Sequence, residues 1–283
     1  MTTTECYSTS TTHRMRYLDS GHDQSGNSDL TVVLLHDGAW GGDADTTWTR
    51  MLTCMPSGMR VIAPDLLGFG RSDKVVYLDR SPYDFRAMAI FDLLDELGIE
   101  YPVDLVGSSF GGSVALRALQ VFGIADRIRS VTSISGTGGP WRTPTAMSEL
   151  GRFDGTVEDM DRIVGHLTEP FQGYKQYLSR RVESALVPGH YQCMMAPHAR
   201  LPESIRTQRA DDQYPGVLSS STTPLHLIAG DRDVLVEHGW AERIADLHGG
   251  MSHVTHLDAS HSPNLSHPAE TWTEVEPFLR RVG

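Results

Sequence analysis

The sequence predicts an α/β protein in which helices flank a mostly parallel central sheet and a helical cap is inserted between two strands. Short apolar runs alternate with segments of helical periodicity, as in consecutive βαβ units. The middle of the chain breaks this alternation and lacks a convincing strand. The 283 residues, 39 % of them apolar, suffice for one large domain with a sizeable core.

The expected strands are short apolar runs at residues 31–36, 59–66, 103–108, 128–135, 224–230 and 252–258. Helices are expected at residues 85–99, 110–122, 238–248 and 269–281. The first of these helices is indicated by apolar residues near helical spacing: Met88, Phe91, Leu94 and Leu97. Gly98 is a typical residue at the end of such a helix.

A connection of roughly 80 residues separates two of these strands, which is far too long for an ordinary loop. It contains two amphipathic stretches, at 156–167 and 173–186, that indicate helices. A disordered linker fits poorly because the segment contains Trp, Phe, Tyr and Met. The predicted division is a core domain of residues 1–136 and 220–283 and a helical cap (lid) domain of residues 137–219.

The charge balance bears on the partners. Lys and Arg number 24 against 36 Asp and Glu, which gives a net charge of −12 at pH 7. Such an acidic chain argues against nucleic acid or an anionic membrane surface as a partner. The N-terminus lacks the apolar run of a signal peptide, and no window approaches a membrane span. The three scattered cysteines imply no disulfide framework and no metal site. A soluble cytoplasmic protein is expected.

The stretch DLVGSSFGG carries the pattern G-x-S-x-G, with Ser109 between Gly107 and Gly111. The pattern alone is weak, but here it follows a buried strand and precedes a helix, which is the context of a nucleophile elbow. That turn is so tight that the residues two before and two after the serine must be small. We therefore expect Ser109 to be the nucleophile and Ser108 to point elsewhere. The alternative is that Ser109 only caps the helix.

A serine hydroxyl is a poor nucleophile without a base, and 13 histidines compete for that role. His261 is preferred because it lies just past the last expected strand, on a loop that can reach the top of the sheet. His253 and His256 lie within that strand, and His267 precedes a proline at an expected helix start.

The carboxylate that orients the histidine should follow the preceding strand, where IAGDRDVLV supplies Asp231 and Asp233. Asp233 is preferred because it lies further out on the loop, and Asp231 is the alternative. The loop after the strand at 128–135 offers no carboxylate before Glu149.

Two backbone N–H groups are expected to stabilise the charge that develops on a substrate carbonyl. Phe110 should present one at the start of the helix that follows the elbow. The second should come from HDGAWGGDADTTW, after the first expected strand, where glycine lets a substrate approach closely. Gly38 is preferred as the donor, and Ala39 is the alternative. The stretch could also be an ordinary glycine-rich turn without a catalytic role.

The chain resembles the α/β-hydrolase family along nearly its full length. The matching blocks are LLHDG, APDLLGFGRSDK, VGSSFGG, GDRDVLV and DASHSPNLSHP. The order of nucleophile, acid and base is also that of this family. APDLLGFGRSDK looks most like the branch that hydrolyses carbon–carbon bonds in meta-cleavage products of aromatic catabolism. The resemblance implies the α/β-hydrolase fold and a Ser-Asp-His triad.

The resemblance also implies substrate-binding positions. Members of that branch carry a cap arginine eight residues before the glycine of a Pro-Gly pair, as Arg181 precedes Gly189 here. In the family this arginine helps to hold the dienoate end of the substrate; an exposed helix arginine is the alternative. Three departures concern the substrate pocket: Ser108 stands in place of an asparagine, Ser262 of a tryptophan and Asp37 of a common glycine.

We therefore expect a serine hydrolase that acts on a small organic substrate without a metal or organic cofactor. The first hypothesis is hydrolysis of a carbon–carbon bond in a vinylogous diketone that resembles a meta-cleavage product. The substitutions at Ser108 and Ser262 favour a second hypothesis, an ester or lactone hydrolase. The third is a non-catalytic small-molecule receptor that kept the triad. If the chain associates, a homodimer is expected, because dimers are the commonest soluble oligomers.

Overall fold

The structure is a computed structural model that describes residues 3–9, 12–21, 30–200, 202–204 and 212–282. Within these residues, strands form one sheet in the order β1-β2-β4-β3-β5-β6-β7-β8. β3 to β8 are mutually parallel, whereas β1 and β2 join antiparallel at one edge. The strands are β1 (Thr4–Tyr7), β2 (Arg16–Asp19), β3 (Leu30–Leu35), β4 (Met59–Pro64), β5 (Val103–Ser108), β6 (Ile128–Ile134), β7 (Leu225–Gly230) and β8 (Ser252–Leu257).

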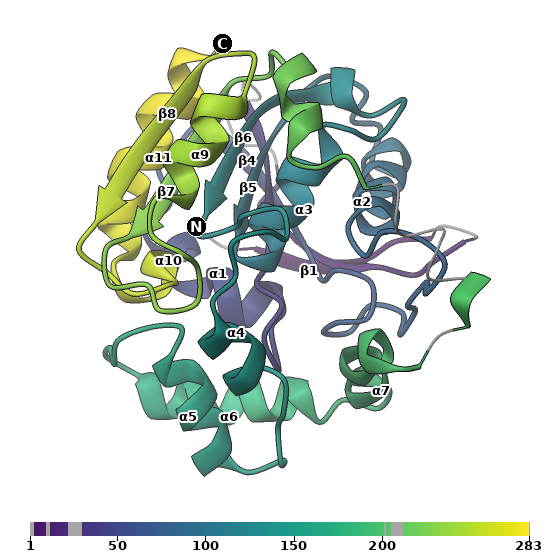
Figure 1. The fold of residues 1–283 in the computed structure, drawn as a ribbon, viewed down its shortest axis with the longest axis vertical. Helices are drawn as coiled ribbons and strands as arrows, with labels where there is room; N and C mark the ends of the chain where they lie inside the picture. Colours follow the sequence, from purple (N-terminus) through teal and green to yellow (C-terminus); the bar gives the residue numbers. More distant parts are fainter. Residues whose placement is uncertain (1–2, 10–11, 22–29, 201, 205–211, 283) are drawn as a thin grey trace.

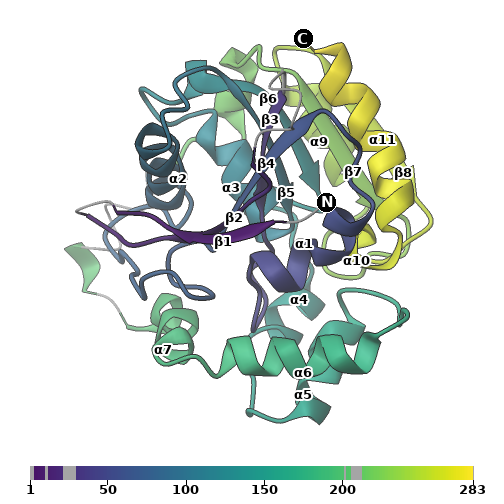
Figure 2. The same cartoon turned by 180° about the vertical axis from the view of Figure 1, so that it is seen from behind.

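The six strands predicted from apolar runs are confirmed, with ends within two residues of the expected ones. β3 and its parallel neighbours β4 and β5 are buried throughout, which explains their continuous apolar character. The edge pair β1 and β2 was not predicted. It lies across one side of the sheet (Figure 2), with β2 paired to β4.

Helices cover both faces of the sheet. α2 (Asp84–Glu96), α3 (Phe110–Ala118) and α9 (Trp240–Leu247) pack on one face, and α1 (Ala44–Thr53) and α11 (Pro268–Arg281) on the other (Figure 1). Because successive side chains of a strand point to opposite faces of the sheet, β3 contributes to the apolar core on each face. Val33 and Leu35 pack on the face of α2 and α3, and Val32 and Leu34 pack on the face of α1 and α11. The remaining short elements here are α10 (Pro263–Ser266), η1 (Ala125–Arg127) and η3 (Gly216–Ser220). None of the described helices is long and apolar enough to cross a membrane.

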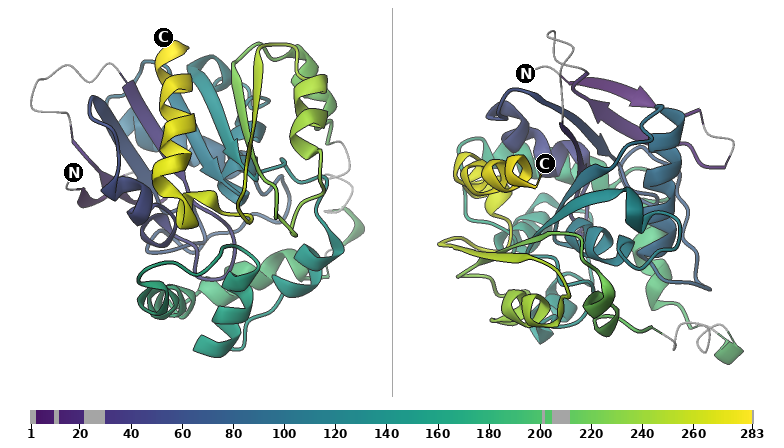
Figure 3. Two further views of the ribbon diagram at one scale, coloured as in Figure 1. Left: turned by 90° about the vertical axis from the view of Figure 1, so that its left-hand side faces the viewer. Right: turned by 90° about the horizontal axis from the view of Figure 1, so that it is seen from above.

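Most of the segment between β6 and β7 lies beyond the ends of the parallel strands, at the bottom of Figure 1 and of the left view in Figure 3, whereas η3 near its end returns to the core beside α9. Apart from one isolated bridge at Arg142, its described residues form helices and turns. These helices are α4 (Pro144–Glu149), α5 (Val157–Gly165), α6 (Tyr174–Ala185), α7 (His190–Met195) and η2 (Ala196–His198). Residues 201 and 205–211 of the predicted cap lie outside the described residues. The segment has its own apolar cluster, in which Met160 and Leu178 pack with Trp40 of the core.

Candidate active site

The turn between β5 and α3 forms a strained elbow at Ser109. Its φ of 53° and ψ of −111° lie in a region that residues other than glycine rarely adopt. A Cβ on Gly107 would collide with the main chain of Gly111, and a Cβ on Gly111 would collide with the carbonyl oxygen of Leu35. Both flanking positions therefore require glycine, and the close packing around them holds the strained serine in place.

Three side chains from the loops after β5, β7 and β8 form a continuous hydrogen-bonded chain. His261 Nδ1 lies 2.7 Å from Asp233 Oδ2, and His261 Nε2 lies 2.7 Å from Ser109 Oγ. Because a carboxylate only accepts hydrogen bonds, Nδ1 is the donor and Nε2 of the neutral ring accepts from the serine hydroxyl. The second Asp233 oxygen accepts from the Leu235 N–H at 2.8 Å, and His261 and Asp233 are both buried. The imidazole is therefore held in one tautomer and one orientation.

The alternative acid and bases lie elsewhere. Asp231 Oδ1 is 3.0 Å from His256 Nδ1, and both side chains are about half exposed on the protein surface. His253 stacks on His226, with ring centroids 5.0 Å apart. His267 Nδ1 lies 2.8 Å from its neighbour Ser266. None of these contacts leads to Ser109.

The two residues expected to form an oxyanion hole lie at the same cavity as Ser109. Gly38 and Phe110 both line the cavity above it, and a Cβ on Gly38 would lie 2.6 Å from Phe110 Cβ. Within the described part of the chain, neither of their N–H groups has a hydrogen-bond acceptor. The N–H of Ala39, in contrast, donates to Asp37 Oδ1 at 2.9 Å. This difference favours Gly38 over Ala39 as the second donor.

A cavity of about 440 Å³ opens above Ser109 and His261. Its volume is in the range of small-molecule sites. Apolar side chains of the core and of the inserted segment supply much of its wall: Phe69, Phe110, Ala146, Met147, Leu150, Met194, Leu235 and Val236. Arg86 and Arg142 also line it. No pattern in the sequence pointed to these two arginines, and Arg86 lies outside the apolar repeat of its helix.

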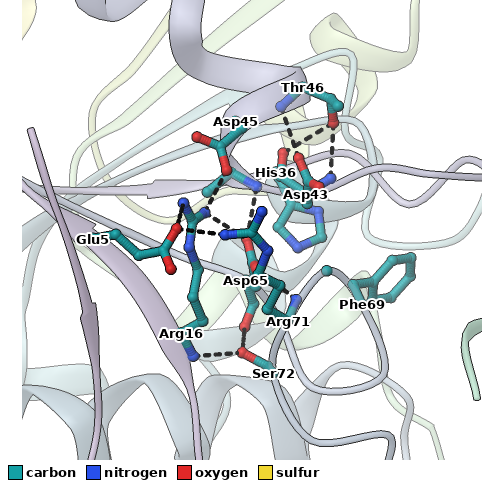
Figure 4. A network of polar contacts seen from close by, with 12 residues as sticks. Glu5, Arg16, His36, Asp43, Asp45, Thr46, Asp65, Phe69, Arg71 and Ser72 are labelled. Carbon is teal, nitrogen blue, oxygen red and sulfur yellow. Dashed lines mark hydrogen bonds and ion pairs between the residues drawn. The ribbon is translucent and has the colours of Figure 1, made fainter. Parts of the chain in front are cut away.

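The loop after β4, which carries Phe69 to the cavity, is fixed by a buried polar network (Figure 4). Asp65 accepts from the Arg71 N–H at 2.8 Å, and Arg16 Nη1 lies 3.4 Å from its carboxylate. A Cβ on Gly70 would collide with the same carboxylate, so the loop requires glycine there. Burial raises the pKa of Asp65 to about 6. The block APDLLGFGRSDK thus forms a well-anchored loop that contributes Phe69 to the wall of the cavity.

Ser108 and Ser262 lie behind the cavity wall. Ser108 is fully buried, and its hydroxyl donates to Asn264 Oδ1 at 3.1 Å. Ser262 is 1 % exposed, and its N–H donates to the carbonyl of Leu167 at 2.8 Å. In the described structure neither of these serines lines the cavity, although both were expected to shape the substrate pocket.

Arg181 and Asp37 form a buried ion pair. Arg181 Nη2 lies 2.5 Å from Asp37 Oδ1, and Nη1 lies 3.1 Å from Oδ2. Nε donates to the Trp40 carbonyl at 2.8 Å, and Nη1 donates to the Tyr177 hydroxyl at 2.7 Å. Burial by itself raises the pKa of Asp37, but the adjacent guanidinium outweighs it and holds that pKa below its usual value. The structure therefore does not bring Arg181 to the cavity, because internal contacts occupy its donors.

Comparison with known proteins places the chain in a family. Residues 32–274 match the profile of the alpha/beta hydrolase family. Because this match spans most of its length, the chain belongs to the alpha/beta hydrolase family. The fold expected from the sequence is thereby confirmed.

Its relatives include hydrolases of meta-cleavage products. The 2-hydroxy-6-oxo-6-(2'-aminophenyl)hexa-2,4-dienoic acid hydrolase of Metapseudomonas resinovorans is 22 % identical over 273 residues, which cover 94 % of this chain and 87 % of that protein. The solved structure of the 2-hydroxy-6-oxo-6-phenylhexa-2,4-dienoate hydrolase from Rhodococcus sp. strain RHA1 matches with a TM-score of 0.81 at 22 % identity, over 99 % of this chain and 98 % of that one. A carboxylesterase from Bacillus subtilis matches with a TM-score of 0.74 at 19 % identity, over 99 % and 92 % of the two chains. At these identities the solved structures establish the shared fold.

Proposed function

We propose that the protein is a serine hydrolase in which Ser109 is the nucleophile, His261 the base and Asp233 the acid that orients it. The observation that carries this proposal is the hydrogen-bonded chain of these side chains, with two contacts of 2.7 Å, at the floor of a cavity. The strained backbone of Ser109 supports it, because such strain concentrates at functional sites.

The geometry supports a two-step acyl transfer. His261 Nε2 accepts the Ser109 proton as Oγ adds to a substrate carbonyl, and Asp233 stabilises the imidazolium that forms. The N–H groups of Phe110 and Gly38 then stabilise the negative oxygen, and each such donor lowers the barrier by about 2.7–4 kcal/mol. Collapse breaks the bond to the leaving group, which takes the proton from His261. Water activated by the same histidine finally releases the acyl group from Ser109.

The preferred substrate is a vinylogous diketone that resembles a meta-cleavage product. The names of similar proteins from Metapseudomonas and Rhodococcus state this chemistry for those proteins. In this reaction the dienol is ketonised before the acyl transfer. The carbon–carbon bond that breaks as the acyl-enzyme forms then releases a stabilised carbon leaving group, which is protonated as it departs. The cavity volume of about 440 Å³ accommodates a substrate of that size.

A carboxylic ester or lactone is the second candidate. The observation that favours it is the contact between Ser108 and Asn264, which turns the Ser108 hydroxyl away from the cavity. The carbon–carbon hydrolase branch commonly has an asparagine at the position of Ser108. An ester needs no ketonisation, and its alkoxide leaving group requires only the proton from His261.

One experiment separates the two candidates and tests the class. The purified protein is given a chromogenic dienoate diketone and a short-chain aryl ester, with Ser109→Ala as the inactive variant and Ser108→Ala as the matched control. Fast loss of the dienoate absorbance supports carbon–carbon hydrolysis, and turnover of the ester alone supports the second candidate. Failure of both reactions, together with failure of a fluorophosphonate to label Ser109, contradicts the proposed function.

A further inference from the structure

The cavity wall carries positive charge without negative charge. Arg86 and Arg142 contribute to it, and no Asp or Glu lines it within the described part of the chain. This contrasts with the whole protein, where acidic residues outnumber basic ones and the net charge is −12. The cavity is therefore locally suited to an anion.

Arg86 differs from the other buried arginines. Those of the described residues are Arg16, Arg60, Arg86, Arg117 and Arg181. All except Arg86 make an ion pair with an aspartate, and within the described structure Arg86 has no acidic partner. A buried charge is normally paired, because transfer of a charge out of water without a counter-charge is strongly unfavourable. The missing counter-charge indicates a ligand.

Arg86 lines the cavity, and two of its three guanidinium nitrogens are held by hydrogen bonds. Its side chain is 5 % exposed, Nε donates to the Leu67 carbonyl at 2.9 Å, and Nη1 donates to the Pro82 carbonyl at 2.6 Å. Within the described residues Nη2 has no acceptor. Cζ lies 5.1 Å from the ring centroid of Phe110, the residue that follows Ser109. Burial lowers the pKa of Arg86 to about 9, so the group is still charged at neutral pH.

We propose that Arg86, rather than Arg181, binds a carboxylate of the substrate and makes the site selective for anionic substrates. This proposal rests on the hydrolase function proposed above and names a specificity-determining residue within it. A guanidinium offers planar, directed donors that match a carboxylate. Two backbone carbonyls hold the Arg86 side chain in place, so little side-chain entropy is lost when the anion binds. Arg142 is exposed and adds positive potential to the same cavity.

A purely structural role for Arg86 is the competing explanation. Its Cζ lies 4.4 Å from the ring centroid of Phe85 and 5.5 Å from that of Phe69, so cation–π contacts hold it in place as well. If these contacts were its whole role, loss of the guanidinium would affect neutral and anionic substrates equally. The test must therefore compare two substrates of nearly the same shape, of which only one carries a negative charge.

The matched substrates are 4-nitrophenyl hemiglutarate, which carries a carboxylate, and its methyl ester, which does not. Arg86→Met keeps most of the apolar stem and removes the charge, Arg86→Lys keeps the charge, and Arg142→Met is the control for the general field of the cavity. We expect Arg86→Met to lower kcat/KM for the anionic ester by about 10–100-fold, mainly through KM, in line with loss of a charged hydrogen bond. For the neutral ester we expect a change within about threefold, and Arg86→Lys should restore part of the loss. Equal losses for both esters overturn the proposal.

Binding to the Ser109→Ala protein makes the test independent of turnover. Calorimetry with the same two esters should show a preference for the anionic one, and Arg86→Met in this background should abolish that preference. Absence of a preference, or a preference that survives Arg86→Met, overturns the role of Arg86. If the preference depends on Arg86 while the wild type hydrolyses no substrate and resists fluorophosphonate, the anion site stands and the hydrolase function fails.

Discussion

Replacement of Arg181 by methionine tests the buried ion pair with Asp37. The two side chains are 0 % and 1 % exposed, so solvent does not screen the stranded carboxylate. Breaking a buried pair typically costs about 3–5 kcal/mol. Asp37 would keep hydrogen bonds from the Ala39 N–H and the Thr47 hydroxyl, each at 2.9 Å. We therefore expect the lower end, about 3 kcal/mol, which is roughly a hundredfold in the folding equilibrium.

The pH dependence gives this prediction a distinct signature. In the wild type the pKa of Asp37 in the folded state is held below its ordinary value. The ionised carboxylate therefore stabilises the fold at any pH above the ordinary value, and this stabilisation is lost as the pH falls from the ordinary pKa toward the folded-state pKa. In Arg181→Met burial acts without the guanidinium, and the folded pKa rises above the ordinary value. The penalty is then largest at neutral pH and shrinks as pH falls, because protonation removes the unpaired charge.

Urea unfolding followed by tryptophan fluorescence measures both effects. Arg180→Met is the matched control: this neighbouring arginine is exposed, and its loss should change the free energy of unfolding by no more than about 0.5 kcal/mol. In the double variant with Asp37→Asn, much of the stability should return, because no buried charge is stranded. A deficit that equals the control, or one that does not shrink between neutral and acidic pH, would refute the reasoning.

Three further predictions concern the triad, the elbow and the protonation of a buried histidine. Asp233→Asn should lower kcat by about 10⁴-fold, as loss of the orienting carboxylate does in other serine hydrolases, whereas Asp231→Asn should leave steady-state rates nearly unchanged. Gly111→Ala should abolish activity and lower the melting temperature because its Cβ would collide with a main-chain carbonyl, whereas Gly165→Ala, with open space around it, should be tolerated in the same thermal scan. Burial lowers the pKa of His226 to about 3, so the folded state resists protonation and stability falls as pH drops below about 6.5. Between about pH 7 and 4.5 this loss should be about 3 kcal/mol smaller in His226→Gln when unfolding is measured at each pH.

β3 to β7 could be predicted from sequence because they are buried almost throughout, which favours apolar residues on both faces. β1 and β2 could not, since the segments TECY and RYLD are only four residues long and half of their residues are polar. Their stability comes from pairing with β4 and from the ion pairs of Arg16, which is 2 % exposed and lies near Asp65 and Glu5. Such contacts join distant parts of the chain and leave no periodic pattern.

The elbow could be predicted because its requirement is local: the two glycines that allow the turn lie within two residues of Ser109. The position of Arg181 depends on Asp37, 144 positions earlier, and no spacing rule connects them. On α2, Met88 belongs to the apolar repeat yet is 52 % exposed, while the charged Arg86 on the same helix is 5 % exposed. The sequence shows residue types along a helix, but the direction of its buried face depends on what packs against it.

The ion pair with Asp37 decides whether the Arg181 guanidinium is available to bind a substrate carboxylate. With a carboxylate at this position, the Arg181 guanidinium is neutralised and its donors are occupied. With glycine there, as the related branch commonly has, the same guanidinium would need another anion. Under the proposal above, the charge for a bound carboxylate comes instead from Arg86, which has no acidic partner among the described residues. The two arginine variants should therefore differ in kind: Arg181→Met should lower stability and affect both esters alike, whereas Arg86→Met should affect the anionic ester selectively. If the selective loss instead followed Arg181, the two assignments would have to be exchanged.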